Sequence, residues 1–388
     1  MGVELLPELT VAADTVLQVG YEPGAPTDVI QSLTNPTILL GALAGGAFGA
    51  ALGALPAFIF TGFLVIGGSL GGGGFGVDVG FGPVFGPHIS FAGGAAAAAY
   101  AADRGYMESG FDYHNAKDIG FALGSKPDIL AVGAVFGVFG VLIEQLSRQL
   151  AIPVDPIPVS IVISALVVRA IFGYSIVGAV SDKANGYFDM GPFEREEMRE
   201  PGEVKGDGGK ASEDRLAVEP WLPNMYKWSH VAAIGFFAGL ASGVITYNMI
   251  SGGHGLIAVF AGFGISAGSL LFLNLGVDRI PVTHHMTLAG STAFLSVWQG
   301  GITTLTDLSA GDLTAPLAFG AAPALLFGAL FGVFAAVVGE ASQRVFYAHS
   351  ATPLDPPAAA IVVWSLTLGL LVIAGLLNWA VWIPGTGI

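Results

Sequence analysis

The stretch Pro87-His-Ile-Ser-Phe-Ala-Gly93 occurs a second time in the chain, as His284-His-Met-Thr-Leu-Ala-Gly290. Both copies contain the pattern His, apolar, Ser or Thr, apolar, Ala, Gly. In each copy an approach that contains Gly or Pro opens a short hydrophobic segment of small residues. An ionisable residue at corresponding points of two apolar segments is the strongest functional indication in the sequence.

The composition is that of a polytopic membrane protein. Mean hydropathy is +0.71 and only 11% of the residues are charged, and many apolar runs approach the length that crosses a bilayer. The 58 glycines fit close packing between membrane helices. A net charge of -15 argues against nucleic-acid binding. This acidic balance resembles that of haloarchaeal proteins, whose surfaces stay hydrated in concentrated salt.

Further matching stretches occur in the same order in both halves of the chain, which predicts an internal duplication. They pair Phe60–Ser69 with Phe260–Ser269, Gly133–Phe139 with Gly328–Phe334, and Asp155-Pro156 with Asp355-Pro356. We therefore predict an all-α integral membrane protein of about ten transmembrane segments, five in each half. The segments are expected at 36–55, 57–72, 86–102, 127–150, 156–180, 229–250, 254–275, 284–301, 316–347 and 356–382.

The predicted domain organisation follows from composition. Residues 1–34 form an acidic N-terminal arm, 35–180 the first membrane repeat, 181–228 a hydrophilic, flexible linker, and 229–388 the second repeat. Helix starts are predicted at Asn35-Pro36 and at the two Asp-Pro pairs, because Asn or Asp caps a helix and Pro suits its first turn. The third segment of each half is short or broken, because glycines and prolines precede it.

Charge distribution predicts that the two repeats are inverted. No Lys or Arg precedes Arg104, and most of the others lie at 103–127, in the linker, and around Arg279 and Arg344. The positive-inside rule then places the linker in the cytoplasm and both termini outside, which requires an odd number of spans per half. The expected localisation is the cell membrane.

The repeated histidine stretch supplies the first candidate site. His88, Ser90, His285 and Thr287 open the broken third segments, which in inverted-repeat transporters meet near the bilayer midplane. The alternative is that each histidine caps a helix at the water interface. Asp78 and Asp278 precede the histidines; these carboxylates either pair with them or cap loops.

Three further charged groups lie within apolar segments. Glu144 with Arg148 and Glu340 with Arg344 are i,i+4 pairs near helix ends, interpreted as structural ion pairs or as gates on opposite faces. Arg169 lies within the fifth segment with no matching Arg in the second half. It is expected to face the protein interior and to contact a carboxylate or an anionic substrate.

Enzymatic chemistry and cofactors are not expected. The chain has no cysteine, no HExxH motif, no Ser/His/Asp spacing and no phosphate-binding loop. His284 and His285 are adjacent, and neighbouring histidines on a helix rarely bind one ion, so no metal is predicted.

The duplicated layout with one histidine per half resembles that of the ammonium channels, and urea channels share the duplication. Asp355-Pro356-Pro357-Ala358 is similar to the His-Pro-Pro motif of a small membrane family, with Asp in place of His. The inverted duplication and the broken, His-bearing segments predict a secondary transporter or channel for a small solute or ion, in contact with the lipid bilayer and forming a homo-oligomer. The rival hypothesis is a structural membrane protein that builds an oligomer or lattice.

Overall fold

The computed structural model describes residue 29 and residues 33–71, 79–107, 113–200, 215–252, 255–297 and 320–382. In these parts the chain is helical; a single bridge, Met198 to Leu216, is the one β interaction there. The helices of the first half are α3 (Pro36–Leu52), α4 (Ala54–Gly71), α6 (Ser90–Asp103), α7 (Pro127–Gln149) and α8 (Pro156–Phe172). Those of the second half are α10 (Trp228–Ser251), α11 (Gly255–Asn274), α12 (His284–Ser296), α14 (Ala321–Phe346) and α15 (Pro356–Ile373). Each lies at one of the positions where a segment was predicted.

Local sequence sets the starts of three of these helices. The side chains of Asn35, Asp155 and Asp355 accept hydrogen bonds from backbone N–H groups in the first turns of α3, α8 and α15. Pro follows each of them, where its missing N–H costs no intrahelical bond. The predicted caps are confirmed. α8 ends at Gly173, whose φ of 75° is the left-handed conformation that glycine adopts without strain.

Several of the helices could cross a membrane. Among the described residues, α7, α10, α14 and α15 are long and apolar enough by themselves, and α3 and α4 form a fifth candidate as a pair bent by 118°. α6 and α12 have 14 and 13 residues, which extend only about 20 Å. Breakers before Ser90 and His284 shorten these helices. Large apolar side chains such as Leu40, Val135 and Phe237 are exposed on outer helix faces, as expected of surfaces that contact lipid.

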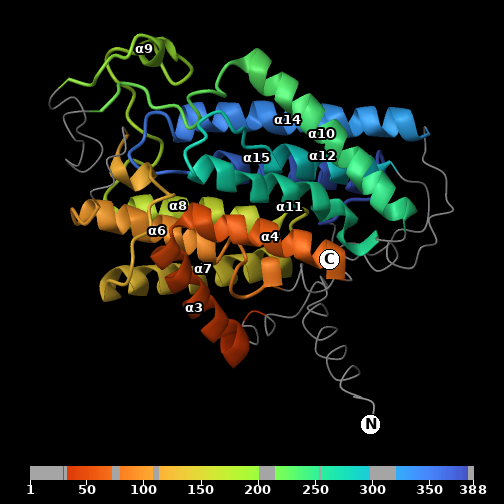
Figure 1. Ribbon diagram of the computed structural model, residues 1–388, viewed down its shortest axis with the longest axis horizontal. Coiled ribbons are helices and arrows are strands. Elements are labelled where there is room, and N and C mark those ends of the chain that lie inside the picture. Colours follow the sequence, from red (N-terminus) through yellow and green to blue (C-terminus); the bar gives the residue numbers. More distant parts are fainter. Residues whose placement is uncertain are drawn as a thin grey trace.

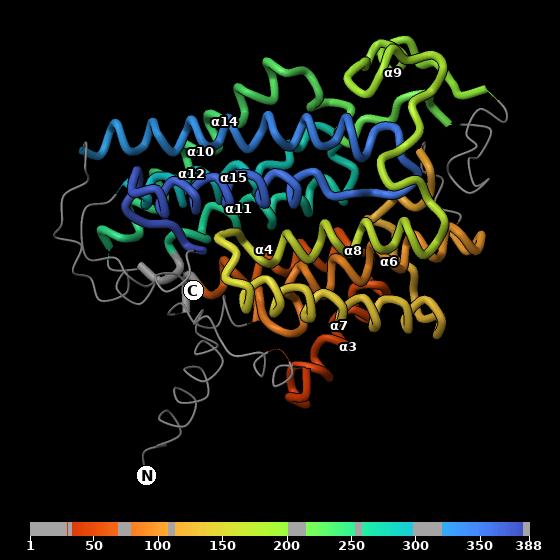
Figure 2. The backbone as a smooth tube through the Cα atoms, turned by 180° about the vertical axis from the view of Figure 1, so that it is seen from behind, coloured from red at the N-terminus to blue at the C-terminus, as the bar shows by residue number. Residues whose placement is uncertain are grey.

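The two halves pack their helices in the same pattern. In the first half α3 contacts α6 and α7, and α7 contacts α8; in the second half α10 contacts α12 and α14, and α14 contacts α15. Figures 1 and 2 show the halves as two adjacent layers, the first coloured red to yellow and the second mainly teal to blue. Between the layers α4 packs against its counterpart α11, and α8 against its counterpart α15.

α8 and α15 run in opposite directions. The backbone N–H of Asp155, at the start of α8, donates to the hydroxyl of Ser365, in the middle of α15. At the other end, Arg169 of α8 donates to Thr352, which precedes α15. Contacts between like elements of two similar units are those that a two-fold axis produces.

Glycines bring the helix backbones into contact at an equivalent crossing in each half. In the first, Gly46 of α3, Gly93 of α6 and Gly133 of α7 meet; a Cβ at Gly93 would lie 2.7 Å from the Gly133 carbonyl oxygen. In the second, Gly239 and Gly290 meet Gly328, with 2.6 Å between a Cβ at Gly328 and the Gly290 oxygen. No larger residue fits at this separation, which explains why these helices carry glycine at the crossing.

The region predicted as a flexible linker is packed where the structure describes it. Residues 181–200, including the short α9 (Gly191–Glu194), and residues 215–227 lie against the end of the helical bundle (Figure 1). Met190 and Val218 form a small apolar cluster with Ala348, which belongs to the connection between α14 and α15. Arg215 and Glu219 form a fully buried ion pair in the same region. Its hydrophilic composition therefore reflects buried charges as well as solvent exposure.

Candidate functional site

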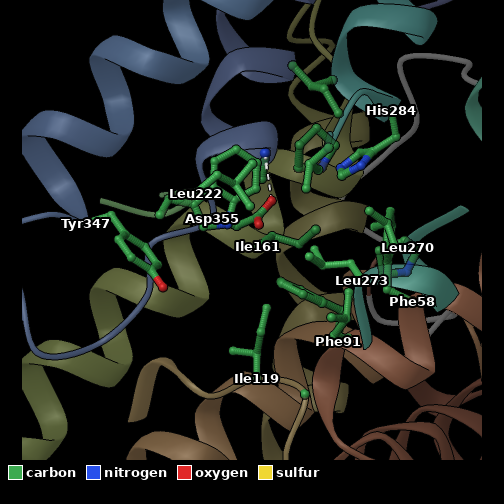
Figure 3. Close-up of a pocket in the computed structure, with 18 of the residues that line it drawn as sticks. Phe58, Phe91, Ile119, Ile161, Leu222, Leu270, Leu273, His284, Tyr347 and Asp355 are labelled. Atoms are coloured by element: carbon green, nitrogen blue, oxygen red, sulfur yellow. Dashed lines mark hydrogen bonds between the residues drawn. The ribbon is translucent and has the colours of Figure 1, made fainter. Parts of the chain in front are cut away.

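A cavity of about 790 Å³ lies between the two halves. Most of its wall is apolar and aromatic, and its polar groups come from loops and from the first and last turns of helices (Figure 3). Aromatic lining residues include Phe58, Phe81, Phe91, Phe260, Phe263, Trp221 and Trp382; polar ones include Lys117, Asp155, His284, Tyr347 and Asp355. A largely apolar pocket of this size with a few convergent polar groups is typical of a small-molecule site.

Corresponding positions of the two halves line this cavity together. The repeated stretch contributes Pro87 and His284, and also Phe91 and Leu288. The region after the two Asp-Pro pairs contributes three more pairs: Asp155 and Asp355, Pro158 and Ala358, and Ile161 and Ile361. Ile161 and Asp355 face the same space in Figure 3. The cavity is therefore formed by equivalent elements of both halves.

His284 is the histidine that reaches the cavity. Its side chain is buried, and its ring lies 4.7 Å from that of Phe58 and 5.8 Å from that of Phe263. Its Nδ1 makes no hydrogen bond to the residues that the structure describes. His285 aligns with His88 in the repeated stretch. The sequence therefore predicted His285, and not His284, as a site residue. Pro87, the residue at the equivalent position of the first half, also lines the cavity, but no pattern in the sequence distinguishes this position from the next one.

Asp155 and Asp355 place two carboxylates on the cavity wall. One oxygen of Asp155 accepts from the N–H of Ile157 at 3.0 Å, and one of Asp355 accepts from the N–H of Ala358 at 2.8 Å. Neither side chain forms an ion pair with a described residue. The sequence predicted that both aspartates cap helices, and this prediction is confirmed. It did not predict that both line the same cavity.

A buried charge cluster joins the cavity to the linker. The Lys117 Nζ lies 2.6 Å from Glu219, and the guanidinium of Arg215 donates two hydrogen bonds to the same carboxylate, at 2.8 and 2.7 Å. All three side chains are fully buried. Burial lowers the pKa of Lys117 to about 7, opposed by the Glu219 charge, which favours the ammonium form. The cluster fixes residues 215–222 against the helical bundle.

The predicted site residue His88 lies outside the cavity lining. Its Nε2 is 3.6 Å from Glu144, whose carboxylate also accepts from Arg148 at 2.8 Å. The predicted Glu144–Arg148 pair thus has a third member, and within it Arg148 reaches the cavity. Ser90 begins α6, and its hydroxyl donates to the carbonyl of Phe85.

His285 and Thr287, the second-half counterparts, also lie outside the cavity lining. The His285 ring lies near Trp221 and beside Gly339 of α14, and the Thr287 hydroxyl donates to the backbone of His284. Among the described contacts, His88 and His285 do not touch each other. The predicted pair Glu340–Arg344 forms at 2.6 Å, and Arg344 also binds backbone carbonyls of the linker, so it anchors the linker on α14.

Arg169 is buried and engaged by the protein itself. Its guanidinium donates to the carbonyls of Ile176, Phe346 and Thr352 and to the Thr352 hydroxyl. The structure therefore places it at the junction of the halves, against backbone oxygens. Of the two predicted aspartates, Asp278 lines the cavity, and Asp78 lies outside the described residues.

Within the described parts of the chain, no three His, Asp or Glu side chains are arranged to hold a metal ion.

Fold and cavity together define a helical protein in which several apolar helices could cross a membrane and two similar halves enclose a chamber. The chain matches the model of DUF7973, a family of unknown function, over residues 28–386, and it belongs to that family. No curated protein and no solved structure matches it.

Proposed function

We propose that this protein is a multi-pass membrane protein of two inverted repeats that transports a small solute through the cavity between them. The observation that carries the proposal is the lining of the cavity by equivalent residues of both halves, such as Asp155 with Asp355 and Ile161 with Ile361. In inverted-repeat transporters the substrate binds at the interface of the repeats, beside helices that begin within the membrane.

Three features support the inverted arrangement. α8 and α15 run antiparallel, α4 packs against α11, and the helices inside each half follow one contact pattern. The bases of the chain cluster at 103–127 and in the linker, which fits a cytoplasmic linker and external termini. The short helices α6 and α12 start beside the cavity, where an interrupted backbone can be tolerated because it faces a chamber rather than lipid.

Transport is favoured over a purely structural role because the interface between the halves is hollow. A scaffold gains stability from a filled interface, whereas about 790 Å³ of open volume forgoes packing contacts. Such a volume suits a small organic molecule and exceeds what an ion or a single water needs.

A flux experiment with purified protein in liposomes tests the proposal. The panel would contain labelled small organic cations, anions and neutral solutes, and flux of at least one solute above protein-free liposomes is expected. Ile361→Trp places an indole in the cavity and should lower that flux at least ten-fold. Val363→Trp, two residues along α15 on an exposed face, is the matched control and should retain it. Absence of flux for every solute, or equal flux in both variants, would overturn the proposal.

A further inference from the structure

The charge balance of the cavity differs from that of an anion site. Two cations, Lys117 and Arg148, reach the lining, and each forms an ion pair with a glutamate outside it, although Lys117 shares Glu219 with Arg215. Glu219 lies 2.6 Å from Lys117, and Glu144 lies 2.8 Å from Arg148. An anionic ligand would therefore find no uncommitted cation on the wall.

Two carboxylates of the cavity, those of Asp155 and Asp355, form no ion pair with a described residue. Asp155 and Asp355 each use one oxygen to cap a helix, and the other oxygen makes no hydrogen bond to a described residue. Helix N-termini stabilise carboxylates, but by a partial charge that does not cancel a full negative charge. A chamber of low polarity with two such groups favours a ligand that brings positive charge and N–H donors.

The remaining wall suits the apolar part of such a ligand. The rings of Phe58 and Phe91 lie 5.9 Å apart and those of Phe58 and Phe263 lie 5.8 Å apart, both edge to face. Aromatic rings attract cations as well as hydrocarbon surface. His284, buried beside Phe58 with an unpartnered Nδ1, provides an additional polar contact at this wall. Figure 3 shows His284, Phe58 and Asp355 around the same space.

From these observations we infer that the cavity binds an amphipathic organic cation, a protonated amine on an aromatic or branched apolar body. The ammonium lies at one of these two carboxylates, Asp155 or Asp355, which stand at the starts of antiparallel helices, and the apolar body lies against Phe58, Phe91 and Phe263. This inference deepens the proposed function, on which it rests for the role of the cavity, by naming the substrate class.

The test compares three ligands of similar shape and different charge on the purified full-length chain in detergent. These are labelled 2-phenylethylammonium, neutral 2-phenylethanol and anionic 3-phenylpropanoate, measured by equilibrium dialysis. The ammonium is expected to bind at least ten-fold more tightly than the alcohol, and the carboxylate to bind weakest. Equal binding of ammonium and alcohol, or no saturable binding of the ammonium at millimolar concentration, would overturn the inference without any variant.

A double variant tests whether the two aspartates are the groups that bind the ammonium. In Asp155→Asn/Asp355→Asn both caps remain, because Asn caps helices as well as Asp, but the negative charges are lost. Its affinity for the ammonium should fall to that for the alcohol. Asp189→Asn, which alters a capping aspartate in the linker outside the cavity, should leave the preference unchanged. An ammonium preference that persists in the double variant would also refute the inference.

Binding and flux separate the two proposals. If the ammonium binds in detergent but no solute crosses liposomes, the transport function fails and the cation site stands. If liposomes transport neutral solutes and the ammonium does not bind, transport stands and the cation inference fails.

Discussion

The two halves of the molecule share their backbone packing and differ in their polar chemistry. Both cross three helices at glycines, Gly46 and Gly133 in the first half and Gly239 and Gly328 in the second. In contrast, His88 lies beside Glu144, whereas His285 contacts Trp221 and no carboxylate among the described residues. The duplicated unit thus keeps the contacts that set its shape and varies the side chains that set its electrostatics.

The difference also affects the cavity. At equivalent positions the first half offers Pro87 and the second half His284, so one wall carries an imidazole that the other lacks. A chamber lined by corresponding residues of both halves but with one-sided hydrogen bonding can orient an asymmetric ligand. The comparison leads to four expectations, from the largest effect to the smallest.

The glycine crossing should tolerate substitution least. A Cβ at Gly46 would overlap the carbonyl of Gly133, so Gly46→Ala should lower the free energy of unfolding by at least about 3 kcal/mol. At Gly239 the nearest oxygen, that of Gly328, would be 2.8 Å away, and the loss should be smaller. Thermal unfolding in detergent measures both variants. Gly67→Ala has open space around it and should be neutral or slightly stabilising; an equal loss at Gly67 would contradict the packing argument.

Attachment of the linker to the first half should depend on Lys117. Lys117→Met removes one of the two cationic neighbours of Glu219 but leaves its two hydrogen bonds from Arg215, and should cost about 2–3 kcal/mol of unfolding free energy. Lys183→Met removes an exposed pair with Glu200 and should change stability by less than about 1 kcal/mol. Both are measured by denaturant titration. A cost for Lys117→Met as small as that for Lys183→Met would show that the cluster does not hold the linker.

The connection before α15 should make the second half sensitive to acid. Burial is the main cause that lowers the pKa of His349 to about 4, while the unfolded chain keeps about 6.5. Between these values the unfolded state binds the proton first, so stability is lost as pH falls from 6.5 to 4, by up to about 1.4 kcal/mol per pH unit from this group. The equivalent connection, 150–154, contains no titratable side chain.

Unfolding midpoints across that pH range provide the measurement. His349→Gln should flatten the dependence because the glutamine amide does not titrate, and Gln can still donate to the Tyr187 carbonyl that His349 contacts. His230→Gln changes an exposed histidine and should leave the slope unaltered. A slope unchanged in His349→Gln would assign the acid sensitivity to other groups.

The smallest effect should come from comparing the two i,i+4 pairs. Glu144→Gln removes the carboxylate shared by His88 and Arg148 and should cost about 2 kcal/mol. Glu340→Gln should cost about 1 kcal/mol, because Arg344 keeps two backbone carbonyls and the Trp228 ring. The difference between the two unfolding free energies is the measured quantity. The reverse order would mean that His88 gains nothing from Glu144.

Sequence reasoning located the helices and their caps because those features are local. Breakers before Ser90 and His284, and Asn or Asp before Pro, constrain neighbouring residues whatever the rest of the chain does. The candidate site was located less well. His88 and His285 align in sequence, yet the cavity receives the preceding residue of each stretch, Pro87 and His284. One helical position changes the direction of a side chain by about 100°, and which direction faces the cavity depends on the neighbouring helices.

Arg169 and the linker were interpreted from hydropathy alone, which does not report on distant partners. The Arg169 guanidinium is satisfied by carbonyls about 180 residues away in the chain, and Lys117 by a glutamate in the linker. Such partners become visible only when the chain is folded, because a buried charge is stabilised by whatever groups the fold brings to it.

The sequence by itself predicted a helical, apolar, glycine-rich chain with matching stretches in its two halves, short third segments and three capped helix starts. Periodicity, composition and local backbone preferences are written in neighbouring residues and need no tertiary context. The tertiary structure decided that the halves enclose a cavity, that Asp155 and Asp355 share its wall, and that His284 rather than His285 reaches it. These depend on the rotation of each helix against its neighbours, which is set by close packing across the whole molecule.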